Sequence, residues 1–266
     1  MLFQSIILGI VQGLTELLPI SSSAHLALIP QIFHWEEISP SFDVALHAGT
    51  LLAIAIFFFK DWIGLIVGVY KQVVKKEKST EGRMFWYIVA ATIPGGIIGF
   101  ILDKFAADIL TKPIIIAIAL IVMGIILYLV DKNAKSNTKY EDMTFKQTFL
   151  IGLSQALAFI PGVSRSGVTM TTGRAMGVDR ESAAKYSFML SAPIVLGATI
   201  FKLKDFVFNL PFFVGVITSF IVGLLVIKFL LEYLKKGSFK VFAIYRVIVG
   251  VLVIGLIIAG VLPLWA

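Results

Sequence analysis

Two polar segments interrupt an otherwise apolar chain, and both carry residue types suited to phosphoryl transfer. The first, VQGLTELLPISSSAH from Val11, contains a glutamine and a glutamate four residues apart, three consecutive serines and a histidine. The second, PGVSRSGVTMT from Pro161, contains two serines, an arginine and two threonines. A carboxylate, hydroxyls, an imidazole and a guanidinium together can position a phosphate and neutralise its charge.

The first segment predicts a broken helix with an anion site at the break. Gln12 and Glu16 are four residues apart and share one helix face, and Pro19 ends or bends that helix. The serines at 21–23 are favoured N-cap residues for a second short helix, whose positive end faces the break and can bind an anion. Non-helical backbone at membrane depth must be buried in protein or line a cavity. We therefore expect a polar cavity here.

The second segment complements the first. Pro161–Gly162 breaks a helix, Ser164 and Ser166 offer hydroxyls and caps, and Gly167 lets backbone approach a ligand closely. Arg165 is a permanent cation whose planar fork matches phosphate oxygens. Because a lone arginine at this depth costs about 2.5–3.5 kcal/mol on insertion scales, we expect an anionic or polar partner for it.

Each of these residues also has a purely structural interpretation. Glu16 could pair with Arg165 as a structural carboxylate, and the serines could serve simply as caps of a kinked helix. His25, like His34 and His47, could be an ordinary packed residue near the membrane interface. The convergence of a carboxylate, a hydroxyl, an imidazole and a guanidinium on two similar breaks favours a site for phosphoryl transfer over these structural interpretations.

The composition indicates an integral membrane protein, taken as one domain over residues 1–266. Of the residues, 58% are hydrophobic and 15% charged, and the mean hydropathy is +0.95. With no cysteine, thiolate nucleophiles and disulfides are excluded. The net charge of +7 fits basic cytoplasmic loops beside anionic lipid better than nucleic acid, which we do not expect as a partner. No signal peptide is recognisable at the N-terminus.

The apolar segments predict an all-α polytopic fold. Six of them reach the spanning length of about 20 residues, approximately Phe42–Phe59, Met84–Leu102, Pro113–Val130, Ala183–Phe201, Pro211–Leu231 and Ala243–Leu262. Two further stretches, Leu2–Pro30 and Phe145–Gly173, are interrupted by Pro, Gly and Ser and are not clean spans. Hydropathy alone is also compatible with eight spans.

The two interrupted stretches resemble each other and predict an inverted repeat. GIVQGLTELLPISSS from Gly9 aligns with GLSQALAFIPGVSRS from Gly152, which places Gln12 on Gln155 and, after a one-residue slip, Ser22 on Ser164. Each stretch precedes three spans, giving halves of about 1–131 and 145–266. If each stretch is a re-entrant helical hairpin, the odd number of crossings inverts the second half.

Basic residues predict the orientation. The loops 60–83, 131–146 and 232–242 hold thirteen Lys and Arg, whereas 103–112 and 202–210 hold four and 24–41 none. The positive-inside rule therefore places both termini outside and opens the first break, and with it the active site, to the exterior face of the cell membrane.

At these residues the chain resembles undecaprenyl-diphosphatase, the bacitracin-resistance (BacA/UppP) family of membrane phosphatases. The resemblance rests on Gln12, Glu16 and PISSSAH in the first motif, on PGVSRSGVT in the second, and on DMT at Asp142, GAT at Gly197 and FAIYR at Phe242. It implies hydrolysis of undecaprenyl diphosphate in peptidoglycan recycling and bacitracin resistance, with Mg²⁺ or Ca²⁺ as cofactor. Gln12 stands where many relatives have a second Glu.

Carried over residue by residue, the family's functional positions are Glu16, Ser22, His25, Ser164 and Arg165. Our chemical interpretation makes Glu16 a metal ligand with Gln12, and Ser22 the nucleophile with His25 as its general base. Attack by His25 itself, or by water on a phosphate held by Ser22, is also compatible with these residues. Further candidates for substrate binding are Ser21, Ser23, Ser166 and Thr169.

The main alternative is a polyprenyl-phosphate flippase or transporter, since inverted repeats with broken helices are a transport architecture. A carrier needs an anion clamp such as Arg165, but it has less need of a hydroxyl, an imidazole and a carboxylate within about ten residues. The expected partners are the lipid substrate, membrane lipids and, as an open alternative, a second copy in a homodimer.

Overall fold

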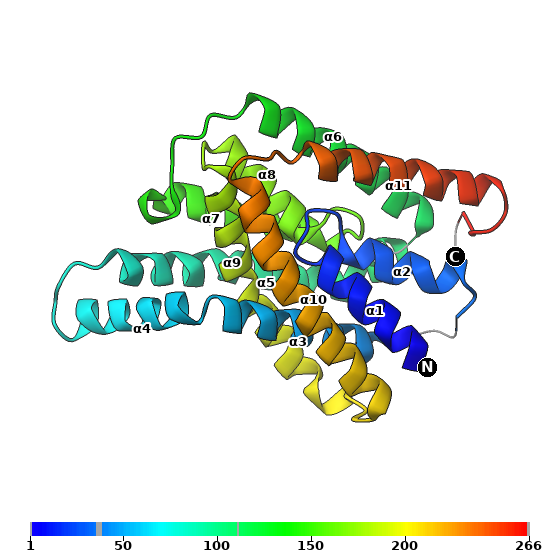
Figure 1. The fold of residues 1–266 in the computed structure, drawn as a ribbon, viewed down its shortest axis with the longest axis horizontal. Coiled ribbons are helices and arrows are strands. Elements are labelled where there is room, and N and C mark those ends of the chain that lie inside the picture. Colours follow the sequence, from blue (N-terminus) through cyan, green and yellow to red (C-terminus); the bar gives the residue numbers. More distant parts are fainter. Residues whose placement is uncertain (1, 36–38, 111, 265–266) are drawn as a thin grey trace.

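The computed structural model describes residues 2–35, 39–110 and 112–264, with backbone alone at 99–100 and 102–110. Residues 36–38 and 111, which belong to two predicted outside loops, lie outside this part. The chain forms α1 (Leu2–Thr15), α2 (Ser22–Ile32), α3 (Pro40–Phe57), α4 (Phe59–Val73), α5 (Thr80–Leu110), α6 (Pro113–Asn133), η1 (Tyr140–Asp142), α7 (Phe145–Ser154), η2 (Gln155–Phe159), α8 (Arg165–Ala175), α9 (Arg180–Lys202), η3 (Leu203–Asp205), α10 (Leu210–Leu234) and α11 (Lys240–Ile258) (Figure 1).

The six predicted spans fall on α3, α5, α6, α9, α10 and α11. Five helical segments of the described chain are long and apolar enough to cross a membrane, namely α3, α6, α9 with η3, α10 and α11. Large apolar side chains on these helices are exposed, among them Leu225 at 65% and Ile258 at 82%. Such surfaces are stable against lipid chains rather than water, and the protein is a multi-pass α-helical membrane protein.

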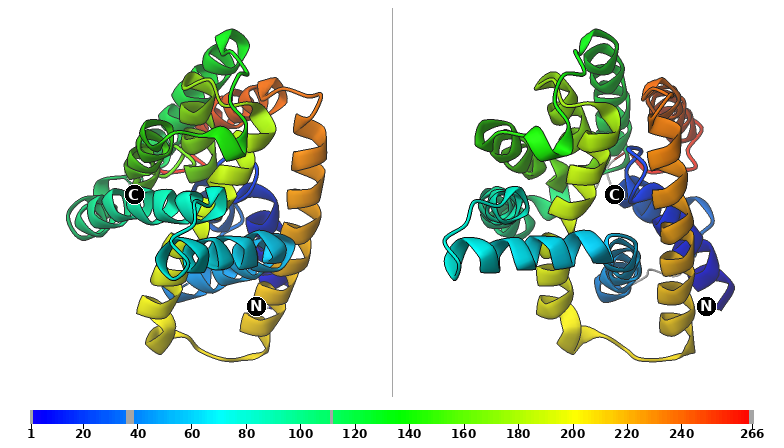
Figure 2. Two further views of the ribbon diagram at one scale, coloured as in Figure 1. Left: turned by 90° about the vertical axis from the view of Figure 1, so that its left-hand side faces the viewer. Right: turned by 60° about the vertical axis from the view of Figure 1, so that its left-hand side comes forward.

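Small residues let α10 approach two other helices closely. The helix runs beside α1 and α3, as two views show (Figures 1 and 2). A Cβ at Gly9 would lie 2.7 Å from the carbonyl oxygen of Gly215, and one at Gly13 would lie 2.7 Å from Cβ of Val222. This is the small-residue packing common between membrane helices, and it fixes α1, which leads to the first break, against α10.

The first break lies between α1 and α2, which pack side by side (Figure 1). The sequence predicts that the first helix ends at Pro19, but α1 ends at Thr15. A proline disfavours helical backbone at the preceding residue and has no N–H to donate, so the chain leaves the helix before reaching it. Leu17 and Ile20 are buried in the connecting turn. The non-helical backbone is therefore covered by protein, as membrane depth requires.

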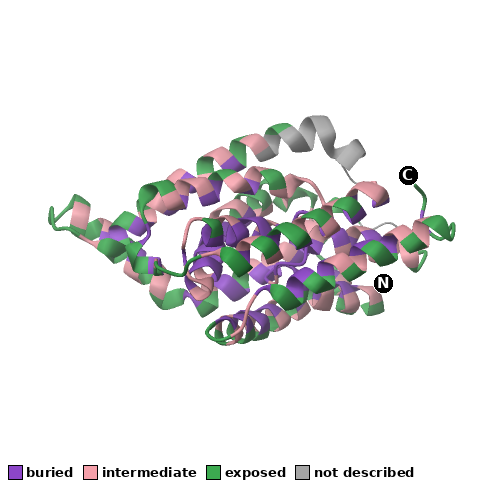
Figure 3. Ribbon diagram, turned by 90° about the horizontal axis from the view of Figure 1, so that it is seen from above, coloured by how far each residue is buried: buried purple, intermediate pink, exposed green. Residues whose placement is uncertain are grey.

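The second break is built from α7, η2 and α8. A capping box of Thr144 and Gln147 starts α7, and η2 carries the chain to Pro161–Gly162. Gly162 has a φ of +95°, a conformation that favours glycine. Buried residues gather in the middle of the molecule, as Figure 3 shows, and the residues of both breaks are mostly buried or half-buried.

Residues 60–83, predicted as a cytoplasmic loop, contain a further helix. α4 follows α3 after a break at Phe58 and packs antiparallel to α5 (Figure 1). Its basic residues suggest a loop, but Ile63, Ile66, Val67 and Tyr70 give it a helical apolar stripe. These side chains are exposed, between 44% and 58%, so α4 extends the apolar surface rather than forming a solvated connection.

The two breaks share an unusual N-cap. Ser21 and Ser164 precede α2 and α8, and both have a positive φ, 77° and 72°. Each hydroxyl accepts a hydrogen bond from the backbone N–H three residues later and lies 3.2 Å from the hydroxyl of the serine two residues later. Non-glycine residues rarely adopt this backbone conformation, so Ser21 and Ser164 share an uncommon local geometry.

The matching caps favour a different alignment from the predicted one, which pairs Ser22 with Ser164. With Ser21 opposite Ser164, Gln12 and Gln155 still correspond and no slip is needed. Ser22 then corresponds to Arg165, and each is the first residue of its helix. Three consecutive serines leave the choice of cap open in the sequence, and the backbone conformation identifies Ser21 as the cap.

Candidate functional site

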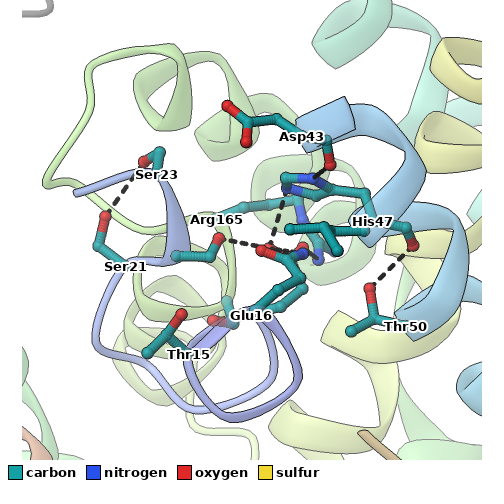
Figure 4. A network of polar contacts seen from close by, with 12 residues as sticks. Thr15, Glu16, Ser21, Ser23, Asp43, His47, Thr50 and Arg165 are labelled. Carbon is teal, nitrogen blue, oxygen red and sulfur yellow. Dashed lines mark hydrogen bonds and ion pairs between the residues drawn. The ribbon is translucent and has the colours of Figure 1, made fainter. Parts of the chain in front are cut away.

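Glu16 lies at the centre of the site, in the turn after α1. Its side chain is only 6% exposed and is surrounded by donors from three helices (Figure 4). Arg165 Nη2 donates to Oε1 at 2.5 Å, and the Ser22 hydroxyl donates to Oε2 at 2.5 Å. Nε2 of His47 lies 3.3 Å from the same Oε2. The pairing of Glu16 with Arg165 considered from the sequence is present.

Ser22 holds its hydroxyl between this carboxylate and an open cavity. As the first residue of α2, it lies at the positive end of the helix dipole. Apolar residues of α3, η2 and α9 line the cavity together with seven polar residues, namely Glu16, Ser22, Ser23, His47, Gln155, Ser164 and Arg165. A cavity lined by both kinds of residue suits a lipid with a charged head.

His25 does not meet Ser22, although the spacing in the sequence allows it. Its Nδ1 lies 2.7 Å from the carbonyl oxygen of Ser21, and its Nε2 lies 2.8 Å from the hydroxyl of Tyr245. The ring also stacks on Tyr245, with centroids 5.8 Å apart. Both nitrogens are engaged away from the cavity, so the predicted pairing of His25 with Ser22 is wrong in this structure. The group that contacts the Ser22 hydroxyl is Glu16.

Two of the predicted residues in the second break face the cavity, and two do not. Ser164 caps α8 and lines the cavity beside Arg165. The Ser166 hydroxyl donates to the Leu18 carbonyl and so ties the two breaks together. The Thr169 hydroxyl lies 2.7 Å from that of Ser187 in α9. Ser166 and Thr169 therefore support the break rather than forming the cavity wall.

The predicted residues of the first serine run divide in the same way. Ser23 lines the cavity. The hydroxyl of Ser21 accepts from the backbone N–H of Gly162 at 3.1 Å and joins the two breaks. Ser21 is thus a cap and a crosslink between the halves.

Arg165 keeps one nitrogen free in the described part of the protein. Nη2 is held by Glu16, whereas Nη1 is buried and has no hydrogen-bond partner there. A buried donor without a partner costs about 1–3 kcal/mol. An oxygen of a phosphate in the cavity would satisfy it, and the guanidinium is already oriented by the carboxylate.

His47 belongs to the site, although its sequence context predicts an ordinary packed histidine. It lies on α3 against Glu16 and lines the cavity. Its Nδ1 lies 2.8 Å from the carbonyl oxygen of Asp43. Two nitrogens that face two acceptors can both donate only when the ring is doubly protonated. Nothing local in FDVALH signals the contact, because Glu16 is 31 residues away.

The oxygens near Glu16 fit a divalent cation only in part. In the described residues no three His, Cys, Asp or Glu side chains form a metal cluster. Gln12, however, donates from Nε2 to Glu16 at 3.4 Å and has a buried Oε1 with no partner in the described part. One carboxylate and one amide oxygen are enough for a cation that takes its other ligands from phosphate and water, as Mg²⁺ usually does.

Comparison with known proteins identifies the family. The model of the family described as bacitracin resistance protein BacA matches residues 5–252. A protein of Pelotomaculum thermopropionicum named undecaprenyl-diphosphatase is 50% identical over 95% of both chains. Proteins of the same name from Desulforudis audaxviator and Moorella thermoacetica are 47% and 45% identical over 95% and 94% of this chain and 96% of their own. With its broken helices and buried carboxylate site, this chain belongs to the bacitracin resistance protein BacA family.

Proposed function

We propose that this protein hydrolyses undecaprenyl diphosphate to undecaprenyl phosphate and inorganic phosphate, as the names of its relatives say of them. Such an enzyme recycles the lipid carrier of peptidoglycan synthesis and confers resistance to bacitracin. The observation that carries the proposal is the meeting of the Ser22 hydroxyl and the Arg165 guanidinium on the two oxygens of Glu16, in the wall of a cavity.

Ser22 is the nucleophile in this proposal, and Glu16 replaces His25 as its base. The Ser22 oxygen attacks the terminal phosphorus while its proton passes to Oε2 of Glu16, with which it is already hydrogen-bonded. The bond from that phosphorus to the bridging oxygen breaks, and undecaprenyl phosphate leaves. Water then attacks the phosphorus of the phosphoserine and the bond to the Ser22 oxygen breaks. The Ser22 oxygen takes back the proton that Glu16 holds, and the inorganic phosphate leaves with both protons of the water. Direct attack by water would use the same base, with Ser22 holding the phosphate.

Arg165 binds the diphosphate and stabilises charge in the transition state. Its unpartnered Nη1 is the first donor available to a phosphate oxygen, and the start of α8 adds backbone N–H groups and a positive dipole end. Its Nη2 stays hydrogen-bonded to Glu16, and this bond keeps the guanidinium oriented. Phosphoryl transfer depends mostly on such positioning and charge neutralisation.

A divalent cation would be held by the Glu16 carboxylate and Gln12 Oε1, which are the protein oxygens suited to it. When bound with the diphosphate, Mg²⁺ or Ca²⁺ would neutralise phosphate charge. Because the protein offers so few ligands, we expect weak metal binding in the absence of substrate.

The finer architecture is also part of the proposal. We infer that the α1–α2 and α7–α8 segments are re-entrant hairpins of an inverted repeat in the cell membrane, with the site open to the exterior. The equivalent caps at Ser21 and Ser164 support the repeat, and the distribution of basic residues supports the orientation. A homodimer stays a prediction. The flippase alternative is not favoured, because the relatives carry the name of a phosphatase.

The test is phosphate release from a prenyl diphosphate by purified protein in detergent, where no second compartment exists for transport. We expect release by the wild type, loss of release with a chelator, and restoration by Mg²⁺ or Ca²⁺. Arg165→Ala is the matched control for contaminating phosphatases. Wild-type release no greater than that of Arg165→Ala would contradict the proposed function.

A further inference from the structure

The FAIYR segment of α11 contributes a buried cation that the catalytic site does not use. Arg246 is 0% exposed, and among the described residues no carboxylate lies within ion-pair distance of it. Its partners are all backbone carbonyl oxygens. An arginine kept at membrane depth without an acidic partner is costly and is expected to serve a function.

The carbonyls that Arg246 binds come from both breaks. Nη1 donates to Pro19 at 3.1 Å, in the turn between Glu16 and Ser22. Nη2 donates to Gly162 at 2.6 Å and to Val163 at 3.0 Å, immediately before Ser164. One guanidinium thus bridges two backbone segments that lie more than 140 residues apart in the sequence. Its planar fork is suited to such simultaneous contacts.

The fold leaves space for this side chain at a specific place. A Cβ at Gly167, in the first turn of α8, would lie 2.7 Å from Nη1 of Arg246. The neighbouring Tyr245 reaches the ring of His25 on α2, with the hydroxyl 2.8 Å from Nε2. Consecutive residues of α11 therefore hold the turn before α2, the start of α2 and the turn before α8.

We propose that Arg246 is a positioning residue, whose hydrogen bonds hold the two breaks together. It thereby sets the distance from Glu16 and Ser22, in the first break, to Arg165, in the second. The proposal rests on the proposed function only for its effect on turnover. The distance between the breaks is a property of the fold and can be measured without substrate. A displacement of about 1 Å between reacting groups can lower a rate about 10²-fold.

The test compares two buried arginines. Arg174, at the C-terminal end of α8, is 1% exposed and binds Asp131, the Ser136 hydroxyl and the carbonyls of residues 134, 135 and 178, none of which lies in the turns 16–21 and 160–164. Arg246→Lys keeps the charge but has a single nitrogen that cannot span three carbonyls in the geometry of the fork. Arg174→Lys makes the same change at a site of equal burial and serves as the matched control.

Two readouts are measured on folded protein purified by size exclusion. The first is kcat and KM for phosphate release. The second is the distance distribution between spin labels at Leu14→Cys and Leu157→Cys, in a chain that has no other cysteine. Both leucines are exposed, at 40% and 52%, and each lies close to one break.

We expect Arg246→Lys to lower kcat about 10²-fold with KM changed less than about threefold, and to broaden the distance distribution. Arg174→Lys is expected to lower thermal stability while kcat per folded molecule and the distances stay at wild-type values. Unchanged distances or turnover in Arg246→Lys, or an equal loss of kcat in Arg174→Lys, would overturn the proposal.

Gly167→Ala replaces Arg246→Lys if that variant does not fold, since it displaces the guanidinium while Arg246 stays in the chain. It is expected to broaden the same distance distribution, and wild-type distances would overturn the proposal. If the wild type releases no phosphate, the proposed function fails. The comparison of label distances still decides whether Arg246 holds the two breaks together.

Discussion

Ser22 and Arg165 each follow a serine cap of the same geometry and donate to opposite oxygens of Glu16. Each is the first residue of its helix after a serine cap with positive φ, and the two hydrogen bonds go to Oε2 and Oε1. One break supplies the hydroxyl and the other the guanidinium. The site is therefore complete only when both halves of the chain are docked, and its chemistry depends on a carboxylate that contacts both.

Replacing Ser22 by alanine tests the nucleophile. We expect kcat to fall by about 10³-fold or more, with little change in the affinity for a non-hydrolysable diphosphate analogue, since the hydroxyl acts in the chemical step. Release of phosphate and binding of the analogue are measured on the same preparation. Ser23→Ala, one residue further along the same cavity wall, is the matched control. Near-normal turnover of Ser22→Ala would leave the hydroxyl as a positioning group for attack by water.

His25→Gln tests the assignment of the base to Glu16. The amide can replace a hydrogen bond to the Tyr245 hydroxyl but cannot act as a base at neutral pH. We expect kcat to stay within about tenfold of wild type, whereas Glu16→Gln should lower it by about 10²–10⁴-fold. A larger loss in His25→Gln than in Glu16→Gln would restore the histidine as the base, and initial rates of phosphate release decide between them.

Gln12→Glu tests the metal ligands. It adds a second carboxylate beside that of Glu16, so the Mg²⁺ concentration for half-maximal activity should fall about tenfold or more. Gln12→Leu should raise that concentration, and a titration of activity with Mg²⁺ measures both. If neither variant changes the metal requirement, Glu16 serves as base and counterion without binding the cation.

His47→Gln and His47→Leu separate the hydrogen bond to Glu16 from simple packing. The amide of glutamine can donate to Oε2, from which Nε2 of the ring lies 3.3 Å away, whereas leucine removes this donor from the buried carboxylate. We expect leucine to lower kcat about 10²-fold and glutamine to restore most of it. Equal activity in the two variants would make His47 a packing residue.

Cysteine labelling tests the orientation in the membrane. The chain has no cysteine of its own, and Asn137 and Ser39 are exposed in the structure. An impermeant thiol reagent on intact cells should label Ser39→Cys but not Asn137→Cys. The basic residues place the loop 131–146, which contains Asn137, on the inside. The opposite pattern would reverse the proposed orientation, and labelling of both sites after permeabilisation is the control.

The sequence predicts the helical segments well because their signals are local. The six predicted spans fall on helices because each is a long apolar run, and both breaks fall where Pro, Gly and Ser cluster. The error at α4 has the same origin. Its lysines and its apolar stripe are both local signals, and they favour different structures. In the fold, α4 packs against α5, and this contact stabilises the helix.

The polar residues of the site are also visible in the sequence, because charge and hydroxyl groups are rare at membrane depth. The pairs that these residues form cannot be predicted from the sequence. His25 is three residues from Ser22 yet turns toward Tyr245 on α11, and His47 reaches Glu16 from α3. Helical spacing states which side chains share a face, but it does not state what that face packs against.

Composition and helix periodicity are properties of short segments, so they predict a broken-helix membrane protein with a carboxylate, a serine and an arginine at its two breaks. The contacts between these segments come from the fold: Glu16 contacts Ser22, His47 and Arg165 together, and Arg246 bridges the breaks. These contacts join residues up to 227 positions apart, and they form because close packing of the helices leaves each buried polar group a small set of partners.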